Sequence, residues 1–474
     1  MPRWTQGLRC LMFAALAALC MARPADVLLS ASDTHPLLTL REAVLIALAE
    51  NERMISSLEN ITQAQLGRTL AASAFATRIT PNLLGSFGQS DVRNQTYGVG
   101  VSKRFTTGTE VRMDVGASTF SNQIGRFYAA DTTLLVRQSL LRGFGPWVGR
   151  RDIERADYQL GSAGRQRVLT EQQVAIDVAA TYYGLIAGRE LVAAARTALE
   201  TAQRLLEASE AKLEAQLVSQ LDVFRARQLL ADAESRLFDA RSAVEDQSDE
   251  LRILMSRDLD YEFRVAAELD ARIEPMEMVE AEGIALRHRI ELRDADAAID
   301  EAERDVRFAR HQLLPQFDIS VAMTRRESAE TLRAAFGVDR FEPVTFFSVS
   351  TPLDRTAENT QLQSAIMERD RRMRERELLR RRIAQEARRA VREQQRLANA
   401  VESADTTVEF AEREVALATL RFQRGLSNNL DVVNAQAALL DATTRRLGVL
   451  TNVAVSRLTL RATLGILDVR RDIH

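Results

Sequence analysis

The sequence predicts a mainly helical protein with a smaller β part, built as a tandem repeat of helix, strands and long helical hairpin. On both sides of residues 425–432, small and apolar residues recur at alternating steps of three and four. This spacing is typical of two helices packed along one seam. Gly425 is suited to end the first helix, and Ser427 or Asn428 to cap the second. Residues 216–223 share Leu, Leu, Asp and Val with this stretch, position by position. The sequence therefore predicts two hairpin tips, at residues 216–223 and 425–432.

Each half also contains a change of period after a proline. We expect one helix from about Arg41 to Thr77, started by a capping box of Thr39 and Glu42 and closed by Pro81. The corresponding helix of the second half ends at about Leu314 and is closed by Pro315. After each proline the apolar period changes from that of a helix to that of a strand.

The expected strands lie within residues 82–141 and 316–352, about four in the first half and two in the second. Residues 111–117 and 317–323 alternate between apolar and polar side chains. Such segments are what a membrane β-barrel needs, but a half-buried soluble sheet alternates too. Leu134–Leu141 and Val344–Thr351 are the expected return strands, and the second is followed by a helix from about Glu358 to Gln423.

Composition supports long, solvent-bathed helices. Aromatic residues are 5%, charged residues are 27% and prolines number nine. A net charge of −3 gives no reason to expect nucleic acid as a partner. The arginine-dense segment 369–389 is interspersed with acidic residues, which indicates a solvated helix face.

The domain organisation follows from the repeat. Residues 1–22 resemble a secretory signal peptide, residues 23–270 form the first repeat and residues 271–474 the second. Both cysteines, Cys10 and Cys20, lie in the signal segment. A lipid anchor on Cys20 is an alternative, disfavoured by Leu19 at a position where a small residue is preferred.

No catalytic constellation is found. The four histidines are scattered, and there is neither a glycine-rich phosphate loop nor a nucleophile motif. Acidic pairs on the helices are those of any solvated face. We therefore expect no enzyme activity, no cofactor and no metal site.

On its tandem order, its two tips, the strand junctions after Thr80 and Leu314, and the junction Gln138–Gly145, the chain resembles the TolC-like outer membrane efflux protein family. The resemblance covers nearly all of the mature chain. It implies a homotrimer in the outer membrane of a Gram-negative bacterium, with four strands per copy in a twelve-stranded β-barrel. The helices would form an α-barrel across the periplasm, with an equatorial band made by the chain ends and the middle of the chain.

The function implied by the resemblance is a passive exit duct of a tripartite efflux pump or a type I secretion system. Its tips would narrow the tunnel and dock to a periplasmic adaptor, also called a membrane fusion protein. Energy would come from an inner-membrane transporter of the RND, ABC or MFS class. The other expected contact is outer-membrane lipid.

The implied site residues are of two kinds. The pore aperture and adaptor contact comprise Leu217, Ser219, Leu221, Asp222, Val223, Gly425, Leu426, Ser427, Leu430, Asp431, Val432 and Asn434. Phe144 and Trp147 are the expected membrane-interface residues. Asp222 and Asp431 carry the strongest expectation, either as helix caps or as pore-lining carboxylates.

Three positions depart from the family pattern. Gln216 replaces a usual glycine, so we expect another residue to end that helix. Asn434 stands where well-known members carry a second acid, and Ser427 where some carry a basic residue. The β segments between Tyr97 and Phe120 exceed a two-strand half, and are either extra barrel strands or a surface hairpin.

One alternative function belongs to a different class. A periplasmic structural or adaptor protein could combine the same coiled-coil hairpins with a soluble β-domain. The two are distinguished by the strands, because a duct needs one face of each strand to be continuously apolar.

Overall fold

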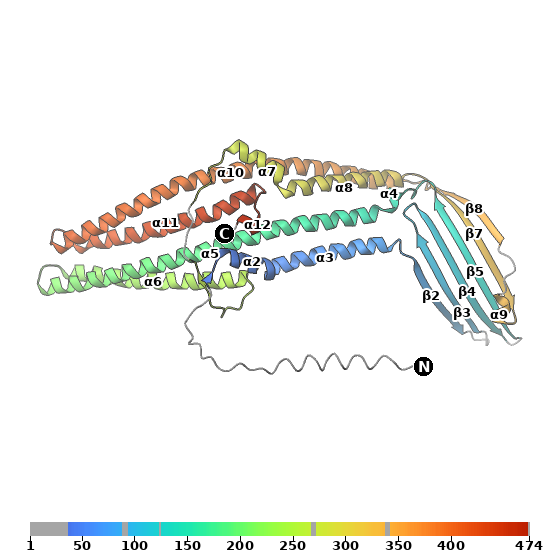
Figure 1. Cartoon of the computed structure of the whole chain (residues 1–474), viewed down its shortest axis with the longest axis horizontal. Coiled ribbons are helices and arrows are strands. Elements are labelled where there is room, and N and C mark those ends of the chain that lie inside the picture. The colour runs from blue at the N-terminus through green and yellow to red at the C-terminus, as the bar shows by residue number, and fades with distance from the viewer. Residues whose placement is uncertain (1–36, 88–92, 123–124, 267–271, 337–341, 473–474) are drawn as a thin grey trace, which may run out of the picture.

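The strands and the hairpin tips lie at opposite ends of an elongated molecule (Figure 1). The computed structural model describes residues 37–87, 93–122, 125–266, 272–336 and 342–472. The predicted signal segment and Cys20 lie outside the described residues. Between the two ends run long helices, of which α5 extends from the sheet to the first tip.

The first repeat contains one helix pair, four long strands and one hairpin. Its elements are β1 (Leu37–Leu38), α2 (Leu40–Glu50), α3 (Glu52–Ser73), β2 (Arg78–Phe87), β3 (Arg93–Arg104), β4 (Thr109–Asn122), β5 (Gly125–Ser139), α4 (Pro146–Gly149), α5 (Arg151–Glu214) and α6 (Gln220–Leu254).

The second repeat has the same order with two long strands. Its elements are β6 (Arg264–Val265), α7 (Met278–His288), α8 (Ile290–Gln312), β7 (Gln316–Ala329), α9 (Leu332–Ala335), β8 (Glu342–Ser350), α10 (Thr356–Gln423), α11 (Asn429–Thr463) and α12 (Val469–Asp472). The prediction of four strands followed by two is confirmed.

Two details of the predicted helices were wrong. The helix expected over residues 41–77 is divided at Asn51, which has an extended backbone and caps α3 by accepting a hydrogen bond from the Arg53 N–H at 2.9 Å. The corresponding helix of the second repeat is divided at Arg289. Pro81 does not close α3, which ends at Ser73, but lies within β2; Pro315 directly precedes β7 as expected. The capping box of Thr39 and Glu42 is confirmed.

The six long strands form a single antiparallel sheet in the order β2-β3-β4-β5-β7-β8. Within the described residues, this sheet thus has six strands where the resemblance implies four per copy in the barrel. The segments between Tyr97 and Phe120 belong to β3 and β4, inside the sheet.

The register of the strands places apolar side chains of all six strands on one face. One row across the sheet is Leu83, Tyr97, Ala117 and Ala130; a second is Pro81, Val99, Val115 and Thr132; a third is Ile79, Val101, Met113, Leu134, Met323 and Pro343; a fourth is Val111, Val136, Val321 and Thr345. Three charged residues lie on the same face at the ends of these rows: Glu327 beside Ala130, Arg325 beside Thr132 and Lys103 beside Val111. Phe317 and Ile319 extend this face on β7, opposite Val349 and Phe347 of β8.

The other face of the sheet carries most of its charged side chains and is crowded between the inner strands, although Leu84, Val344 and Phe346 of the two edge strands also lie on it. A Cβ atom on Gly100 would lie 2.8 Å from a carboxylate oxygen of Asp114, and one on Gly116 would lie 2.8 Å from a carboxylate oxygen of Asp131. Asp318 is buried on this face and binds Arg137 at 2.6 Å. Glycine at the two close approaches leaves room for the acids and allows the sheet to curve toward its polar side.

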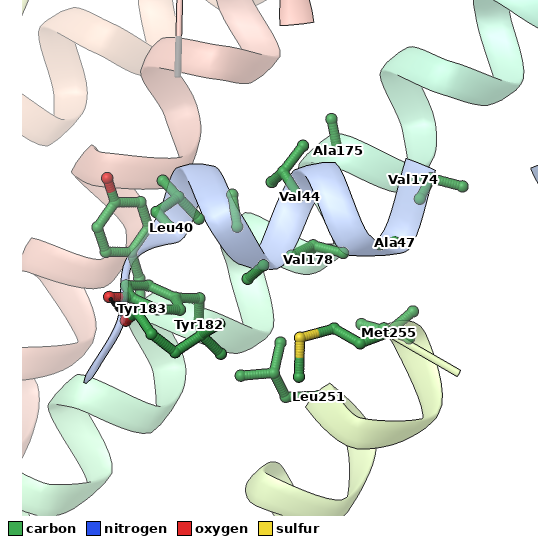
Figure 2. Packing of buried hydrophobic residues seen from close by; sticks show 14 of the residues in the cluster. Leu40, Val44, Ala47, Val174, Ala175, Val178, Tyr182, Tyr183, Leu251 and Met255 are labelled. Atoms are coloured by element: carbon green, nitrogen blue, oxygen red, sulfur yellow. Dashed lines mark hydrogen bonds between the residues drawn. The ribbon is translucent and has the colours of Figure 1, made fainter. Parts of the chain in front are cut away.

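The largest hydrophobic core of the described residues lies where β1, α2, α5, the end of α6, β6, α11 and α12 meet, and Figure 2 shows part of its packing. Leu40, Val44 and Ala47 of α2 pack against α5, and Leu251 and Met255 close the cluster from the end of α6. β1 pairs in parallel with β6, and the Tyr182 hydroxyl donates to the Leu38 carbonyl at 2.9 Å. Leu467 and Val469 from the C-terminal region join the same cluster.

Within the described residues, no helix is both long enough and apolar enough to cross a membrane.

Replacing Asn51 with alanine should destabilise this core. The Asn51 amide donates to the Leu254 carbonyl at 2.8 Å and its oxygen caps α3, so the variant loses a buried bond and a helix cap. We expect a loss of about 2–3 kcal/mol in the free energy of unfolding, measured by urea titration. Asn60→Ala, at an exposed position of the same helix, is the control and should be nearly neutral. Equal stability of the two variants would contradict the assigned role of Asn51.

Candidate functional site: the hairpin tips and the uncovered face of the sheet

The hairpin tips are held far from the sheet by two very long helices. α5 has 64 residues and α10 has 68, so each is about 100 Å long at 1.5 Å per residue. α5 packs antiparallel to α6, and α10 to α11, along seams of small and apolar residues that include Ala226, Ala233 and Ala240 in α6. These side chains permit close approach along the whole length of each hairpin.

Gln216 ends α5 itself, contrary to the expectation that another residue would do so. Its φ is 58°, in the left-handed region, and the Leu217 N–H donates to the Lys212 carbonyl at 2.8 Å. The Gln216 N–H donates to the Leu213 carbonyl at 2.9 Å. This pattern of two bonds is the one that a C-terminal glycine usually makes. Gln216 adopts it at the steric cost that glycine avoids.

The second tip uses glycine as predicted. Gly425 has a φ of 74°, and the Leu426 N–H donates to the Arg421 carbonyl at 2.9 Å. Asn428 is the N-cap of α11, but its side chain makes no capping bond. The two tips therefore have the same backbone path with different residues at the turn.

Two bonds join one tip to the other. The Asn429 amide of the second tip donates to the Asp222 carbonyl of the first at 2.5 Å. In the other direction, the Lys212 ammonium donates to the Phe422 carbonyl and lies 3.9 Å from the centre of the Phe422 ring. Asn429 is fully buried. The sequence prediction missed Lys212 and Asn429; the rarity of lysine, with only Lys103 and Lys212 in the chain, was the available signal.

Asp222 and Asp431 differ despite their matching positions. The Asp222 carboxylate accepts hydrogen bonds from the Ser219 N–H and hydroxyl at 3.1 and 2.8 Å, and Asp222 is only 8% exposed. It thus completes a capping box at the start of α6. Asp431, in the first turn of α11, is exposed. Of the two carboxylates, that of Asp431 is the one open to solvent.

The remaining tip residues separate into exposed and buried groups. Leu217 and Leu426 are each 73% exposed, and Leu221 is 54% exposed. Ser219, Gly425 and Asn434 are also exposed, whereas Ser427 and Leu430 are half-buried. Val223 and Val432 are buried, so within the chain they hold the tips together instead of facing outward. The outer surface of the tips therefore combines three exposed leucines with polar side chains, and Asp431 is an exposed acid among them.

Phe144 and Trp147 lie where the sheet meets the helices. Both are largely exposed, on either side of Gly145, whose φ is 102°. Trp147 packs edge-on against His311 with ring centres 5.0 Å apart, and the Gly143 N–H donates to His311 Nε2 at 3.0 Å. Burial, followed by the charge of Arg142, lowers the pKa of His311 and favours the neutral ring that accepts this bond. His311 thus has a structural role at this junction.

The apolar face of the sheet is uncovered over much of its area. Leu83 is 72% exposed and Phe347 is 77% exposed, at opposite edges of the sheet. Ile79, Val99, Met113 and Val349 are exposed on the same face. A single chain thus leaves a broad apolar surface in contact with solvent, which marks an interaction site.

No group of three or more potential metal ligands occurs in the part of the chain that the structure describes. Several arginines of segment 369–389 form ion pairs: Arg371 and Arg372 lie near Glu368, Arg376 binds Asp296 and Arg388 binds Glu282. The prediction of a mixed-charge, solvated helix face is confirmed.

Comparison with known proteins agrees with this architecture. Residues 283–466 match the model of the outer membrane efflux protein family. The resemblance to outer membrane efflux proteins is confirmed. No curated protein sequence matches the chain.

Solved structures show the same fold over nearly the whole chain. The outer membrane protein VceC of Vibrio cholerae has a TM-score of 0.71 and 18% identity, over 90% of this chain and 96% of VceC. The open state of the MtrE outer membrane channel of Neisseria gonorrhoeae has a TM-score of 0.69 and 17% identity, over 92% of this chain and 90% of MtrE. The CmeC outer membrane channel of Campylobacter jejuni has a TM-score of 0.67 and 15% identity, over 92% of this chain and 88% of CmeC.

Replacing Asn429 with alanine should loosen the tips. The variant loses the buried bond to the Asp222 carbonyl, worth about 1 kcal/mol, and local opening should become about fivefold more frequent. Limited trypsin digestion at the exposed Arg424 should accelerate by the same factor, as followed by mass spectrometry of the fragments.

Asn428→Ala is the matched control, because the neighbouring Asn428 is exposed and its side chain makes no capping bond. If both variants are digested at the rate of the parent protein, the bond between the tips does not control their opening.

Proposed function

We propose that this protein is a passive exit duct of the outer membrane, the outermost component of a tripartite efflux pump or type I secretion system. The observation that carries the proposal is the uncovered apolar face shared by all six strands, at the end of the molecule opposite the tips. Such a surface requires a lipid or protein partner. The family match and the outer membrane channels of the same fold favour lipid.

In this function the sheet end of the molecule lies in the membrane, and the tip end docks to a partner. The sheet lies in the outer membrane of a Gram-negative bacterium, with Phe144 and Trp147 at its periplasmic interface, where exposed aromatic rings are favoured. The helices, about 100 Å long, cross the periplasm. As in the trimer that the resemblance implies, three copies surround one tunnel.

The tips are the docking end. The exposed leucines Leu217, Leu221 and Leu426 offer an apolar surface to a periplasmic adaptor, and the adaptor links the duct to an inner-membrane RND, ABC or MFS transporter. Three copies of Asp431 form a ring of negative charge at the aperture, which favours cations.

A periplasmic coiled-coil protein with a soluble β-domain accounts less well for the sheet. A soluble sheet covers its apolar face with other elements. Here Leu83, Phe347 and Val349 remain exposed. The duct function explains this exposure without a further domain.

A lysine on the apolar face should prevent insertion. Val321 lies on that face of β7, paired with Val136 and Thr345. Val321→Lys places a charge against lipid, at a cost of about 2–4 kcal/mol near the bilayer midplane. We expect most of this variant to be missing from the outer-membrane fraction of expressing cells, as measured by immunoblotting.

Ala322→Lys is the matched control, because the next residue points to the polar face. This variant should reach the outer membrane in normal amount. Equal insertion of the two variants would contradict the assignment of the apolar face to lipid.

Replacing Asp431 with asparagine should reduce cation selectivity. The ring loses one negative charge per copy, so we expect the ratio of cation to anion permeability to fall by about twofold or more in planar bilayers. Asn434→Asp, one turn along α11, should raise the ratio by adding acids at an exposed position. Asp222→Asn should change it least, because that carboxylate is buried in a capping box. Unchanged selectivity in the first two variants would show that Asp431 does not line the aperture.

A further inference from the structure

The sheet ends in two open edges, at β2 and at β8. In a bilayer the backbone groups along such an edge have no water to bind, so an unpaired edge is not tolerated. One chain cannot close its own sheet, because six strands are fewer than the roughly eight of the smallest membrane barrels. The edges must therefore be paired by other chains.

We propose that β2 of each copy pairs with β8 of the next copy, and that three copies close one barrel of eighteen strands. Three times the six strands of the sheet gives this number, in place of the twelve that four strands per copy would give. This inference rests on the proposed function, because the edges must be paired only if the sheet lies in a membrane.

Strand direction allows this closure. β2 leaves the helical part after α3, and β8 returns to it before α10. Every neighbouring pair within the sheet is antiparallel, so β2 and β8 run in opposite directions. Joining β8 of one copy to β2 of the next continues the alternation around a ring without a break.

The pair β3 and β4 belongs to the barrel wall and is not a surface hairpin. Its turn lies at the helical end of the sheet, where the Gly145 N–H donates to the Thr107 carbonyl at 3.3 Å. The packing there is tight: a Cβ atom on Gly108 would lie 2.5 Å from the Gly143 carbonyl oxygen, and one on Gly149 would lie 2.2 Å from the Thr106 carbonyl oxygen. β3 and β4 therefore cross the same band of the sheet as the other strands.

The apolar rows run across these two strands over most of their length. Val99 of β3 lies between Pro81 of β2 and Val115 of β4, and Lys103, opposite Val111, is the charged residue of β3 on this face. Removing β2 and β3 from the wall would leave their apolar side chains without lipid. It would also expose the edge of β4, which is fully paired in the structure.

Both edge strands carry a proline, Pro81 in β2 and Pro343 in β8. A proline is tolerated in an edge strand where its nitrogen faces away from the paired neighbour, so we expect each of these nitrogens at the open edge. Each of the two strands at the seam between copies thereby has one backbone N–H donor fewer. The same prolines oppose pairing with unrelated strands before assembly.

A wall of eighteen strands is wider than one of twelve. Barrel diameter grows roughly linearly with strand number, so the membrane part of the lumen would be about half again as wide. This width concerns the membrane end, since the aperture lies at the tips.

Cysteine cross-linking tests which strands meet between copies. The two natural cysteines both lie within residues 1–22, so a disulfide in the rest of the chain requires introduced residues. Leu83→Cys in β2 is combined in turn with Pro343→Cys, Thr345→Cys, Phe347→Cys and Val349→Cys in β8, all on the apolar face. Because a disulfide needs Cα atoms within about 7 Å, only correctly opposed pairs will react. Outer membranes are oxidised and analysed on non-reducing gels.

We expect at least one of the four combinations to give dimer and trimer bands and none larger, while single-cysteine variants stay monomeric. The control series combines Val115→Cys of β4 with the same four β8 positions, and should give no cross-link. Cross-linking from β4 but not from β2 would overturn the proposal and leave a twelve-stranded wall.

Two further outcomes would also overturn the proposal, and they separate it from the proposed function. Bands that stop at the dimer would mean that two copies close a twelve-stranded wall. A protein that stays in the outer membrane with neither series cross-linking keeps the duct function but excludes the β2–β8 seam. If the protein is found only in the soluble periplasmic fraction, both the duct function and the β2–β8 seam are contradicted.

Discussion

A sheet in a bilayer must find every backbone hydrogen bond within protein, and the rest of this architecture depends on that constraint. It explains why six strands are paired so completely, from β2 through β8. Under the proposed function it also calls for partner chains, since the two edges at β2 and β8 remain open. In the proposed duct, the backbone groups of the edge strands require partner chains, and the side chains determine which face of the sheet contacts lipid and which contacts water.

The helices transmit this arrangement to the other end of the molecule. α5 follows the first strand region after the short helix α4, α10 follows the second strand region, and each long helix continues to one hairpin tip. The core around Leu40, Tyr182 and Leu251 joins the chain ends to the long helices midway along them. Two bonds, from Lys212 and Asn429, hold the tips side by side. The position of the tips is thus determined by helix length and by a small number of polar contacts.

Much of the fold could be predicted because the sequence repeats itself. The Leu–Asp–Val segments at residues 221–223 and 430–432 mark the tips, and the apolar alternation of residues 317–323 marks a strand. The break at Asn51 could not be predicted, because it depends on a bond to the Leu254 carbonyl from a distant part of the chain. Pro81 was misplaced because a proline that suits a helix end also suits an edge strand. Gln216 was misjudged because its left-handed conformation is stabilised by the hairpin and not by its own preference.

At the tips, the matching positions of Asp222 and Asp431 suggested one shared role. The structure separates them, because Ser219 precedes one acid by three residues and Asn428 stands at the corresponding position before the other. A serine hydroxyl exchanges hydrogen bonds with the acid in a capping box, and here the asparagine does not. That single difference buries one carboxylate and leaves the other free.

The location of the protein in the cell tests the central claim most directly. Membranes of a Gram-negative cell expressing the full chain would be separated on a density gradient, and the fractions washed with alkaline carbonate. The account predicts that the protein stays in the outer-membrane fraction after the wash, because its apolar sheet face is held by lipid. Recovery as a soluble periplasmic protein would contradict the account and favour the coiled-coil protein with a soluble β-domain.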